Sequence, residues 1–290
     1  MAGTGAMAYN SREMKRVEAI GSFDDLRSGQ VRFLEEASRL GPLTVFVRDD
    51  EAVRALTGHP PKFPAAERLY VVSALKYVFR AEVVSGPGFP AGPADSSPPE
   101  VWAVPEGDDH PEDRAAAAAR GVEYRTIPEE AVRGFPGSDP HLTAEDGPAI
   151  AASSKKRVIV TGCYDWLHSG HVRFFEEASA FVDVFVDVGS DANIRLLKGG
   201  CHPLFPQAER LYMVQAVRHV RRAFIGTGVG WMDAAPEIEI LKPDSYLVNE
   251  DGDRPEKREF CAARGIAYVV LKRAPAPGLP RRDSTALRGF

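Results

Sequence analysis

The sequence lacks the features expected of a membrane protein or of a disulfide-stabilised secreted protein. Its three cysteines, Cys163, Cys201 and Cys261, are too few and too scattered for a disulfide framework or a CxxC zinc site. No run of about eighteen apolar residues occurs, and residues 1–16 contain no apolar signal-peptide core. We therefore expect a soluble, cytoplasmic protein with no membrane partner.

The sequence also lacks an excess of basic charge. Its 36 Lys and Arg residues against 41 Asp and Glu residues give a net charge of −5. A nucleic-acid partner is not expected, because proteins that bind nucleic acid present a basic face. A small local anion site remains compatible with this charge. Hydrophobic residues make up 44% of the 290 positions, which is enough for two domain cores.

One segment of the sequence occurs twice. The run GSFDDLRSGQVRF, from Gly21, recurs as GCYDWLHSGHVRF from Gly162, and FPxxERLY occurs at 63–70 and again at 205–212. Repeats of this length indicate a duplicated domain rather than a solenoid. We predict domains at 15–137 and 155–290, joined by a linker at 138–154 that is rich in Pro, Gly, Ser and Ala.

The second repeat alternates between strand and helix patterns. Four short apolar runs rich in β-branched residues predict buried strands at 158–160, 182–188, 246–248 and 267–271. Helical spacing occurs at 172–180, 207–220 and 255–264, and a further helix at 231–241 has no counterpart in the first repeat. This alternation predicts an α/β protein with two tandem Rossmann-like parallel-sheet domains, whose ligands bind at the carboxyl ends of the strands.

The strongest motif lies where the first strand of the second repeat gives way to a helix. His168 and His171 are three residues apart with Gly170 between them, near the predicted N-terminus of a helix. Free N–H groups and the helix dipole favour phosphate there, and imidazoles can donate hydrogen bonds to phosphoryl oxygens during transfer. A zinc half-site is the weaker interpretation, because no nearby carboxylate or cysteine completes a ligand set.

This motif resembles the signature of the HxGH nucleotidylyltransferases. The surrounding sequence, from about Lys156 onward, is similar to glycerol-3-phosphate and ethanolamine-phosphate cytidylyltransferases, and to bifunctional heptose-phosphate adenylyltransferases. The resemblance implies that His168 and His171 are catalytic and stabilise the triphosphate in the transition state. It also implies nucleotide binding by the rest of the motif: Gly162, Cys163, Tyr164, Asp165 and Gly170.

The resemblance extends to residues elsewhere in the second repeat. It implies that Lys198 contacts the phosphates and that Arg210 approaches the triphosphate, although the first repeat keeps Arg68 at the same place, so a structural ion pair for Arg210 is weighed equally. Glu250 and Asp251 follow a predicted strand where the family places residues near base and ribose, and a solvated turn is the alternative.

The C-terminal segment is similar to the closing Ser-Thr motif of the family but departs from it. Ser284 and Thr285 are predicted to donate hydroxyls to phosphate, with a plain helix cap as the alternative, and Arg288 is expected to bind nucleotide. Either Arg273 or Arg282 fills the place of the family arginine. The extra arginines, Arg281 and Arg282, are suited to a second anionic group on the substrate.

The first repeat has lost the residues that carry this chemistry. Arg27 and Gln30 stand where the second repeat has its histidines, Leu56 replaces the lysine, and 140–141 reads Pro-His in place of Ser-Thr. We interpret the first repeat as a pseudo-catalytic domain that serves as a built-in partner subunit, forming an intramolecular pseudo-dimer, with a further homodimer open.

The sequence thus predicts a Mg²⁺-dependent nucleotidylyltransferase. We expect transfer of CMP from CTP to a small phosphorylated or phosphonate polyol, sugar or amino-alcohol, with release of pyrophosphate. The alternatives are an adenylyltransferase of the same fold and a nucleotide-sensing protein without turnover. The base is usually read by backbone groups, so the sequence does not separate CTP from ATP.

Overall fold

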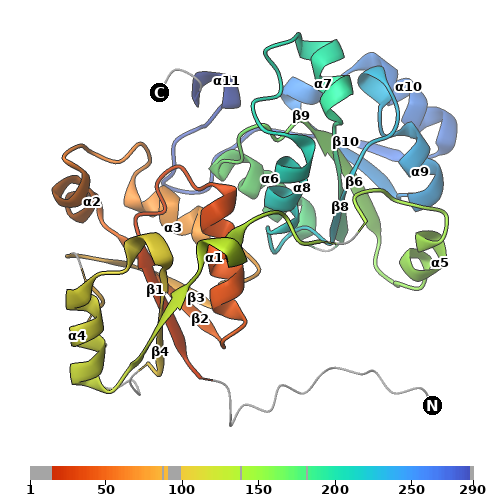
Figure 1. Cartoon of the computed structure of the whole chain (residues 1–290). Helices are drawn as coiled ribbons and strands as arrows, with labels where there is room; N and C mark the ends of the chain where they lie inside the picture. Colours follow the sequence, from red (N-terminus) through yellow and green to blue (C-terminus); the bar gives the residue numbers. More distant parts are fainter. Residues whose placement is uncertain (1–14, 87, 91–98, 138, 181, 288–290) are drawn as a thin grey trace, which may run out of the picture. The chain divides into compact units, whose positions relative to one another are not determined.

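The computed structural model describes residues 15–86, 88–90, 99–137, 139–180 and 182–287. The chain divides into two compact units; the first ends at Arg133 and the second begins at Gly134, with Ala74–Lys76 grouped with the second. Each unit contains one five-stranded parallel sheet (Figure 1). This confirms the predicted α/β class with two Rossmann-like sheets. No helix in the described ranges has the length and apolarity needed to cross a membrane.

The strands of the first unit lie in the order β3-β2-β1-β4-β5. Its elements are, in chain order, β1 (Val17–Gly21), α1 (Ser28–Ser38), β2 (Leu43–Arg48), α2 (Asp50–Thr57), α3 (Ala65–Ser73), β3 (Arg80–Val84), β4 (Val101–Pro105), α4 (Pro111–Arg120) and β5 (Glu123–Ile127). The short 3₁₀ helices η1 (Glu106–Asp108) and η2 (Glu129–Val132) follow β4 and β5. None of the described residues between β3 and β4 is helical.

The second unit repeats this order as β8-β7-β6-β9-β10. Its strands are β6 (Arg157–Gly162), β7 (Asp183–Val188), β8 (Arg222–Ile225), β9 (Ser245–Asn249) and β10 (Ala267–Leu271). Its helices are α5 (Asp146–Ala151), α6 (Ser169–Ser179), α7 (Asp191–Lys198), α8 (Gln207–Gln215), η3 (Gly230–Met232), α9 (Ala235–Leu241), η4 (Glu250–Gly252), α10 (Pro255–Arg264) and α11 (Ser284–Leu287).

Strand alternation determines which side chains meet on one face of the second sheet. Ile159, Phe185 and Tyr246 are buried in one hydrophobic cluster together with residues of α9 and α10. Because successive side chains of a strand point to opposite faces, Thr161 and Asp187 share the face of this cluster two residues further along their strands. These two residues are also paired in register between β6 and β7. The hydrophobic core therefore ends in a polar layer at the carboxyl edge of the sheet.

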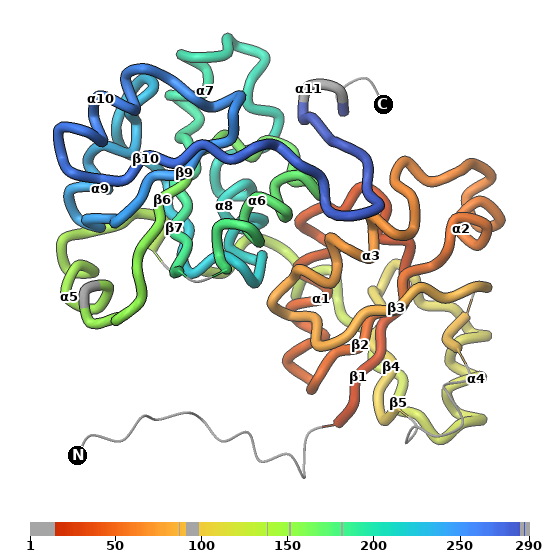
Figure 2. Tube along the Cα trace, turned by 180° about the vertical axis from the view of Figure 1, so that it is seen from behind, coloured from red at the N-terminus to blue at the C-terminus, as the bar shows by residue number. Residues whose placement is uncertain are grey.

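The order of the second sheet creates a crevice at that edge. The chain leaves β6 for β7 and β8 on one side and returns to β9 on the other. Connections diverge at such a switch point, and ligands bind there in open parallel sheets. The segment after β10, drawn in blue in Figure 2, leads to α11.

Three differences from the predicted elements have simple causes. The strand β8 and the helix α7 were not predicted, because their four and eight residues are too short for a clear period. The helix predicted at 207–220 ends at Gln215. Beyond it Val217, which forms an isolated β-bridge, and Val220 are buried outside any helix, so their apolar spacing reflects burial and not a continued helix.

The segment 138–154, which its composition predicts to be a linker, packs as part of the second unit. It contains α5, and Leu142 is 5% exposed within the core cluster of the second unit. Asp146 accepts a hydrogen bond from Arg222 at 2.5 Å, and the carbonyl of Pro140 accepts one from the backbone of Ile225 at 2.7 Å. The Pro-His pair at 140–141 therefore packs in the second unit. The prediction that this Pro-His pair corresponds to the Ser-Thr pair of the C-terminal segment was therefore wrong.

Candidate active site

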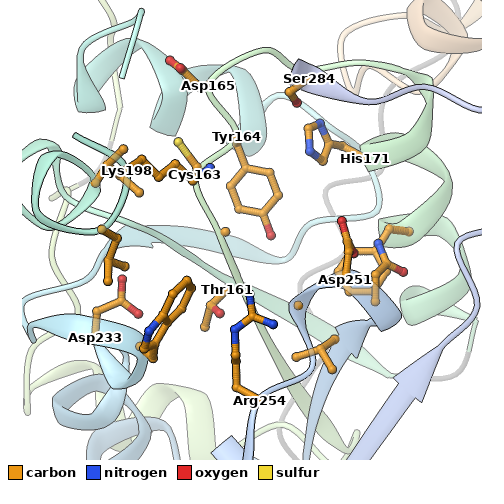
Figure 3. A pocket seen from close by; sticks show the side chains of 18 of the residues that line it. Thr161, Cys163, Tyr164, Asp165, His171, Lys198, Asp233, Asp251, Arg254 and Ser284 are labelled. Carbon is orange, nitrogen blue, oxygen red and sulfur yellow. The ribbon is translucent and has the colours of Figure 1, made fainter. Parts of the chain in front are cut away.

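A cavity of about 350 Å³ lies at the carboxyl edge of the second sheet (Figure 3). It is lined by the ends of β6 and β9, the first turn of α6, the last residues of α7, the loop around Trp231, the start of α10, and the C-terminal segment. Most of the predicted site residues meet here. The lining includes Gly162, Cys163, Tyr164, Asp165, Gly170, His171, Lys198, Asp251, Arg273 and Ser284.

Two glycines allow the motif to fold into this cavity. A Cβ on Gly162 would lie 2.8 Å from the Tyr164 ring, and a Cβ on Gly170 would lie 2.9 Å from the His168 ring. Tyr164 itself adopts a positive φ of 51°. Only glycine leaves room for both rings to turn back over the end of β6 and the first turn of α6. The glycines therefore shape the ring positions, in addition to any contact with nucleotide.

The two histidines of the motif form a stacked pair at the start of α6. Their ring centroids are 4.0 Å apart with an interplanar angle of 24°. His168 is the N-cap residue, and its Nδ1 accepts a hydrogen bond from the Gly170 N–H at 3.1 Å. The neutral ring must then carry its proton on Nε2. In the described part of the chain, neither Nε2 of His168 nor Nδ1 of His171 has a hydrogen-bond partner, although both are buried.

Burial keeps both rings neutral near pH 7. It lowers the pKa of His168 to about 3, with smaller contributions from the positive charges of Arg273 and Arg282. Burial also lowers the pKa of His171 well below its usual value, and His168, Arg273 and Lys198 act in the same direction. His171 lines the cavity, whereas His168 stacks on it and is not part of the lining. The two rings are neutral in a cationic environment, which suits an anionic oxygen better than a metal ion.

The depressed pKa of His168 predicts a pH dependence of stability. The unfolded chain takes up the proton near pH 6.5, whereas the folded chain resists it until about pH 3. The contribution is therefore complete above pH 6.5 and declines as the pH falls from 6.5 toward 3, by at most about 1.4 kcal/mol per pH unit. Urea unfolding at pH 7 and pH 5 should show a smaller difference for His168→Asn than for the wild type. Equal differences would contradict this effect.

Asp165 and Cys163 both line the cavity, and Asp165 also fixes a neighbouring loop. One carboxylate oxygen of Asp165 accepts hydrogen bonds from the backbone of Leu204 at 2.6 Å and of Phe205 at 3.0 Å. The same contacts occur in the first unit, where Asp24 accepts from the backbone of Lys62 and Phe63. The Asp165 carboxylate thus fixes the loop after α7. Burial raises the pKa of the Cys163 thiol, which leaves it protonated.

The acidic loop after β9 and the C-terminal segment meet at Arg273. Its guanidinium donates to Asp251 at 2.6 Å, to Asp283 at 3.3 Å and to the carbonyl of Arg282 at 2.9 Å. These bonds bring Ser284 to the cavity beside His171, as Figure 3 shows. Arg273 lines the cavity, whereas Arg282 does not. The sequence allowed either arginine to fill the place of the family arginine, and of the two Arg273 has the position expected of a ligand contact.

The structure places the remaining predicted residues of this region in several different positions. Glu250 and Arg281 are exposed and lie 3.7 Å apart as an ion pair outside the cavity lining. Thr285 belongs to α11, and Arg288 lies outside the described residues. Lys198 ends α7 with an exposed side chain that makes no ion pair with a described residue.

Arg210 has a structural position instead of the predicted contact with triphosphate. It is 1% exposed and does not line the cavity. Its guanidinium donates to the carbonyls of Phe205, Cys163 and Gly189 and to the Asp191 carboxylate. In the first unit, Arg68 makes the corresponding bonds to Phe63, Ser22, Arg48 and Asp50. An arginine bonded in this way in both units connects loops and strand ends, so nucleotide binding by Arg210 is not supported.

Replacing Arg210 should therefore affect folding. We expect Arg210→Met to lower the free energy of unfolding by about 3–5 kcal/mol, because several buried acceptors and a carboxylate lose their donor. Urea unfolding measures this. Arg195→Met, which removes an exposed guanidinium 4.0 Å from the same Asp191, should cost less than about 0.5 kcal/mol. Unchanged unfolding with weaker nucleotide binding would show that Arg210 contacts the triphosphate.

The comparisons with known proteins identify the family of the second unit. The sequence profile of the cytidylyltransferase-like family matches residues 159–272. The FAD synthase of Ferroglobus placidus is 34% identical over 120 residues, which are 40% of this chain and 75% of that protein. The FAD synthase of Methanopyrus kandleri is 36% identical over 106 residues, 35% of this chain and 67% of that protein. The chain belongs to the cytidylyltransferase-like family of nucleotidylyltransferases.

A longer relative shares the same region. The bifunctional protein HldE of Geobacter metallireducens is 43% identical over 137 residues, which are 43% of this chain and 28% of that protein. The chain thus spans less than a third of the length of this relative. The cytidylyltransferase-like match covers the HxGH motif and β9 but ends before Arg273 and Ser284.

Several cavity residues of this cytidylyltransferase-like unit were missed by sequence reasoning. Trp231 and Asp233 follow β8, and Arg254 and Lys257 lie at the start of α10, just after β9. The rule that ligands bind at the carboxyl ends of strands would have indicated the first two, had the four-residue strand β8 been recognised. No short motif marks the other two.

Proposed function

We propose that the second unit transfers a nucleoside monophosphate from a nucleoside triphosphate to the phosphate or phosphonate group of a small acceptor. The observation that carries this proposal is the stacked, buried histidine pair with unpartnered ring nitrogens at the start of α6. The Nε2–H of His168 is a buried donor with no acceptor among the described residues, which costs free energy unless a ligand supplies one. A phosphoryl oxygen is the acceptor that a helix N-terminus favours.

In the proposed reaction, an acceptor phosphate oxygen attacks the α-phosphorus. The new P–O bond forms as the bond from the α-phosphorus to the bridging oxygen breaks, and the electron pair leaves with pyrophosphate. The attacking oxygen is already anionic, so no general base is needed. His168, His171 and Lys198 stabilise charge that develops on the transferred group, and positioning supplies much of the rate.

Residues of the C-terminal segment are proposed to hold the leaving pyrophosphate. Ser284 lines the cavity near His171, and the proposal extends to Thr285 and Arg288 by the family resemblance. Arg273 is proposed to take the place of the family arginine.

Mg²⁺ is proposed to arrive bound to the triphosphate. Among the described residues, no group of three or more His, Cys, Asp or Glu side chains is arranged to hold a metal ion. The donor set of the chain therefore fits a metal that is carried mainly by phosphate oxygens.

CTP is the proposed donor, and ATP is the second candidate. The cytidylyltransferase-like profile and the resemblance to glycerol-3-phosphate and ethanolamine-phosphate cytidylyltransferases support CTP. The relatives named FAD synthase favour ATP, since FAD contains an adenylyl group. The chemistry around the histidines is the same for both.

The first unit is proposed to be non-catalytic and to act as a resident partner of the second. At the positions of the two histidines, Arg27 forms an ion pair with Asp25 at 2.6 Å, and the Gln30 side chain accepts a hydrogen bond from the Arg27 backbone at 2.9 Å. These side chains form a closed local arrangement and offer no pair of buried ring donors.

Pyrophosphate release measured with each of the four nucleoside triphosphates and a panel of phosphorylated acceptors tests the proposal. Release that requires one triphosphate and one acceptor class is expected. A thermal-shift assay with the same triphosphates identifies the donor independently, because a ligand that binds the native state raises its stability. Nucleotide binding without pyrophosphate release for any acceptor would favour the nucleotide-sensing alternative.

A further inference from the structure

A buried amide joins two walls of the cavity that come from different parts of the chain. One wall is α7, which ends at Lys198, and the other is the loop after β8, which carries Trp231 and Asp233. In Figure 3, Lys198 and Asp233 lie on the same side of the Tyr164 ring. The amide belongs to Asn193 in the first turn of α7, which is 3% exposed and does not line the cavity.

The Asn193 amide bonds this loop at its backbone and at a side chain. Its Oδ1 accepts a hydrogen bond from the Gly230 N–H at 2.7 Å. Its Nδ2 donates to the Gly230 carbonyl at 3.1 Å and to the Asp233 carboxylate at 2.7 Å. A backbone N–H can only donate, so the bond from Gly230 fixes which end of the amide faces which partner. Asn193 thus holds the loop where its backbone turns, at a φ of +79°.

The first unit shows that a helix such as α7 forms without this amide. The equivalent helix α2 also has eight residues, and Ala52 stands at the position of Asn193. In each helix the N-cap side chain accepts a hydrogen bond from the backbone N–H at this position: Asp49 from Ala52, and Ser190 from Asn193. The cap is therefore retained in both units, whereas the amide that bonds the loop is found in the second alone.

This difference between the units matches the distribution of the catalytic motif. The scaffold residues Asp165 and Arg210 have equivalents in the first unit, which make the same bonds there. His168, His171 and Asn193 have no equivalents in it. A buried polar residue that is absent together with the two histidines is expected to serve the site and not the scaffold.

The loop held by Asn193 determines where the Trp231 ring lies. This ring is 44% exposed and packs on the Arg254 guanidinium, 4.7 Å from its centre, so its place depends largely on the loop backbone. We propose that Asn193 is a positioning residue that fixes the loop of Trp231 and Asp233 relative to Lys198. This inference rests on the proposed function. Both substrates must meet between these walls, and a misplacement of about 1 Å costs about 100-fold in rate.

The test replaces Asn193 by leucine, which keeps the volume of the side chain and removes its hydrogen bonds. Pyrophosphate release is measured with CTP and ATP as donors and with glycerol 3-phosphate, a hexose 1-phosphate and phosphoethanolamine as acceptors. The pair that the wild type uses fastest then serves for the variants. In Asn193→Leu, kcat should fall about 30–100-fold. The Kd of the same triphosphate, measured by calorimetry, should stay within about threefold, because α7 and its Lys198 remain in place.

Fluorescence of Trp231 reports the position of the loop without any turnover. The chain has three tryptophans, so the signal of this one is obtained by subtracting the spectrum of the matching Trp231→Phe protein. Acrylamide should quench it at least about twofold more strongly in Asn193→Leu than in the wild type, because a loop without its anchor opens more often.

The matched control is Gln215→Leu, which also replaces a partly buried amide of the second unit by leucine. Gln215 accepts a hydrogen bond from the Ala223 N–H at 2.7 Å, outside the cavity. This variant should lower the unfolding temperature but keep the wild-type kcat and the wild-type quenching of Trp231. If circular dichroism shows Asn193→Leu to be unfolded, Asn193→Ala replaces it, since alanine occupies this position in the first unit.

The outcomes separate this inference from the proposed function. A folded Asn193 variant with the wild-type kcat or with unchanged Trp231 quenching overturns this inference alone. An equal loss of kcat in Gln215→Leu also overturns it, because the effect would then follow from lost stability. No pyrophosphate release by the wild type with any acceptor overturns the proposed function and this inference with it.

Discussion

Replacing His168 or His171 by alanine should lower the kcat of pyrophosphate release about 10²–10³-fold. This is the effect typical of removing one preorganised donor from a site of developing charge. Each ring has a buried nitrogen without a partner in the described ranges, and neither carries a charge near pH 7, so the expected loss comes from transition-state hydrogen bonds. Nucleotide affinity, measured by calorimetry, should change much less than kcat.

His168 needs a variant that separates catalysis from helix capping. Its Nδ1 caps α6 through the Gly170 N–H, so alanine also removes a cap worth about 1 kcal/mol. Asparagine can retain the cap acceptor but not the ring Nε2–H. We therefore expect both variants to lose turnover and only His168→Ala to lose stability. Full turnover in His168→Ala would contradict the proposed mechanism.

The two units provide matched controls for this experiment. The double variant Arg27→Ala, Gln30→Ala alters the corresponding positions of the first unit, and turnover within about twofold of the wild type is expected if that unit is non-catalytic. His219→Ala removes a half-buried histidine outside the cavity, and should also leave turnover unchanged. Loss of turnover in the first-unit variant would show that the first unit contributes to the reaction.

The repeat and the strand-to-helix motif made much of the fold predictable. Alternating apolar runs gave four of the five strands of the second unit, and the helix at 255–264 has the predicted bounds. The short strand β8 was not predicted because four residues carry almost no period. Its absence from the prediction also concealed Trp231 and Asp233, since a residue can be placed at a strand end only when the strand is known.

The sequence could place residues at the site but could not determine their partners. Arg210 and Asp165 occur in a family motif, yet their charged groups bond the protein's own backbone. The retention of Arg68 and Asp24 in the first repeat was the available signal, because residues kept where the histidines are lost serve the scaffold. Lys257 carries no comparable signal. Its place in the cavity depends on how α10 packs against the end of the sheet, which is a property of the folded chain.

Deleting residues 284–290 should abolish turnover while the second unit stays folded. The deletion removes Ser284 from the cavity, together with Thr285 and Arg288, which are proposed to hold pyrophosphate. The Arg273 bonds to Asp251, Asp283 and the Arg282 carbonyl all lie before the deletion point and should persist. We expect at least a 10³-fold loss in kcat, measured by pyrophosphate release, with a folded circular dichroism spectrum.

The deletion also removes Leu287, which is 1% exposed, so a stability loss of about 1.5–3 kcal/mol is expected from this side chain alone. The double variant Ser284→Ala, Thr285→Val keeps Leu287 and removes only the hydroxyls. It should retain wild-type unfolding in urea and still lose about 10–100-fold in kcat, because two donors to the leaving group are gone. A shorter deletion of 289–290 should leave turnover unchanged. If the hydroxyl-free variant turns over at the wild-type rate, the Ser-Thr pair only caps α11, and pyrophosphate must be held by Lys198 and Arg273.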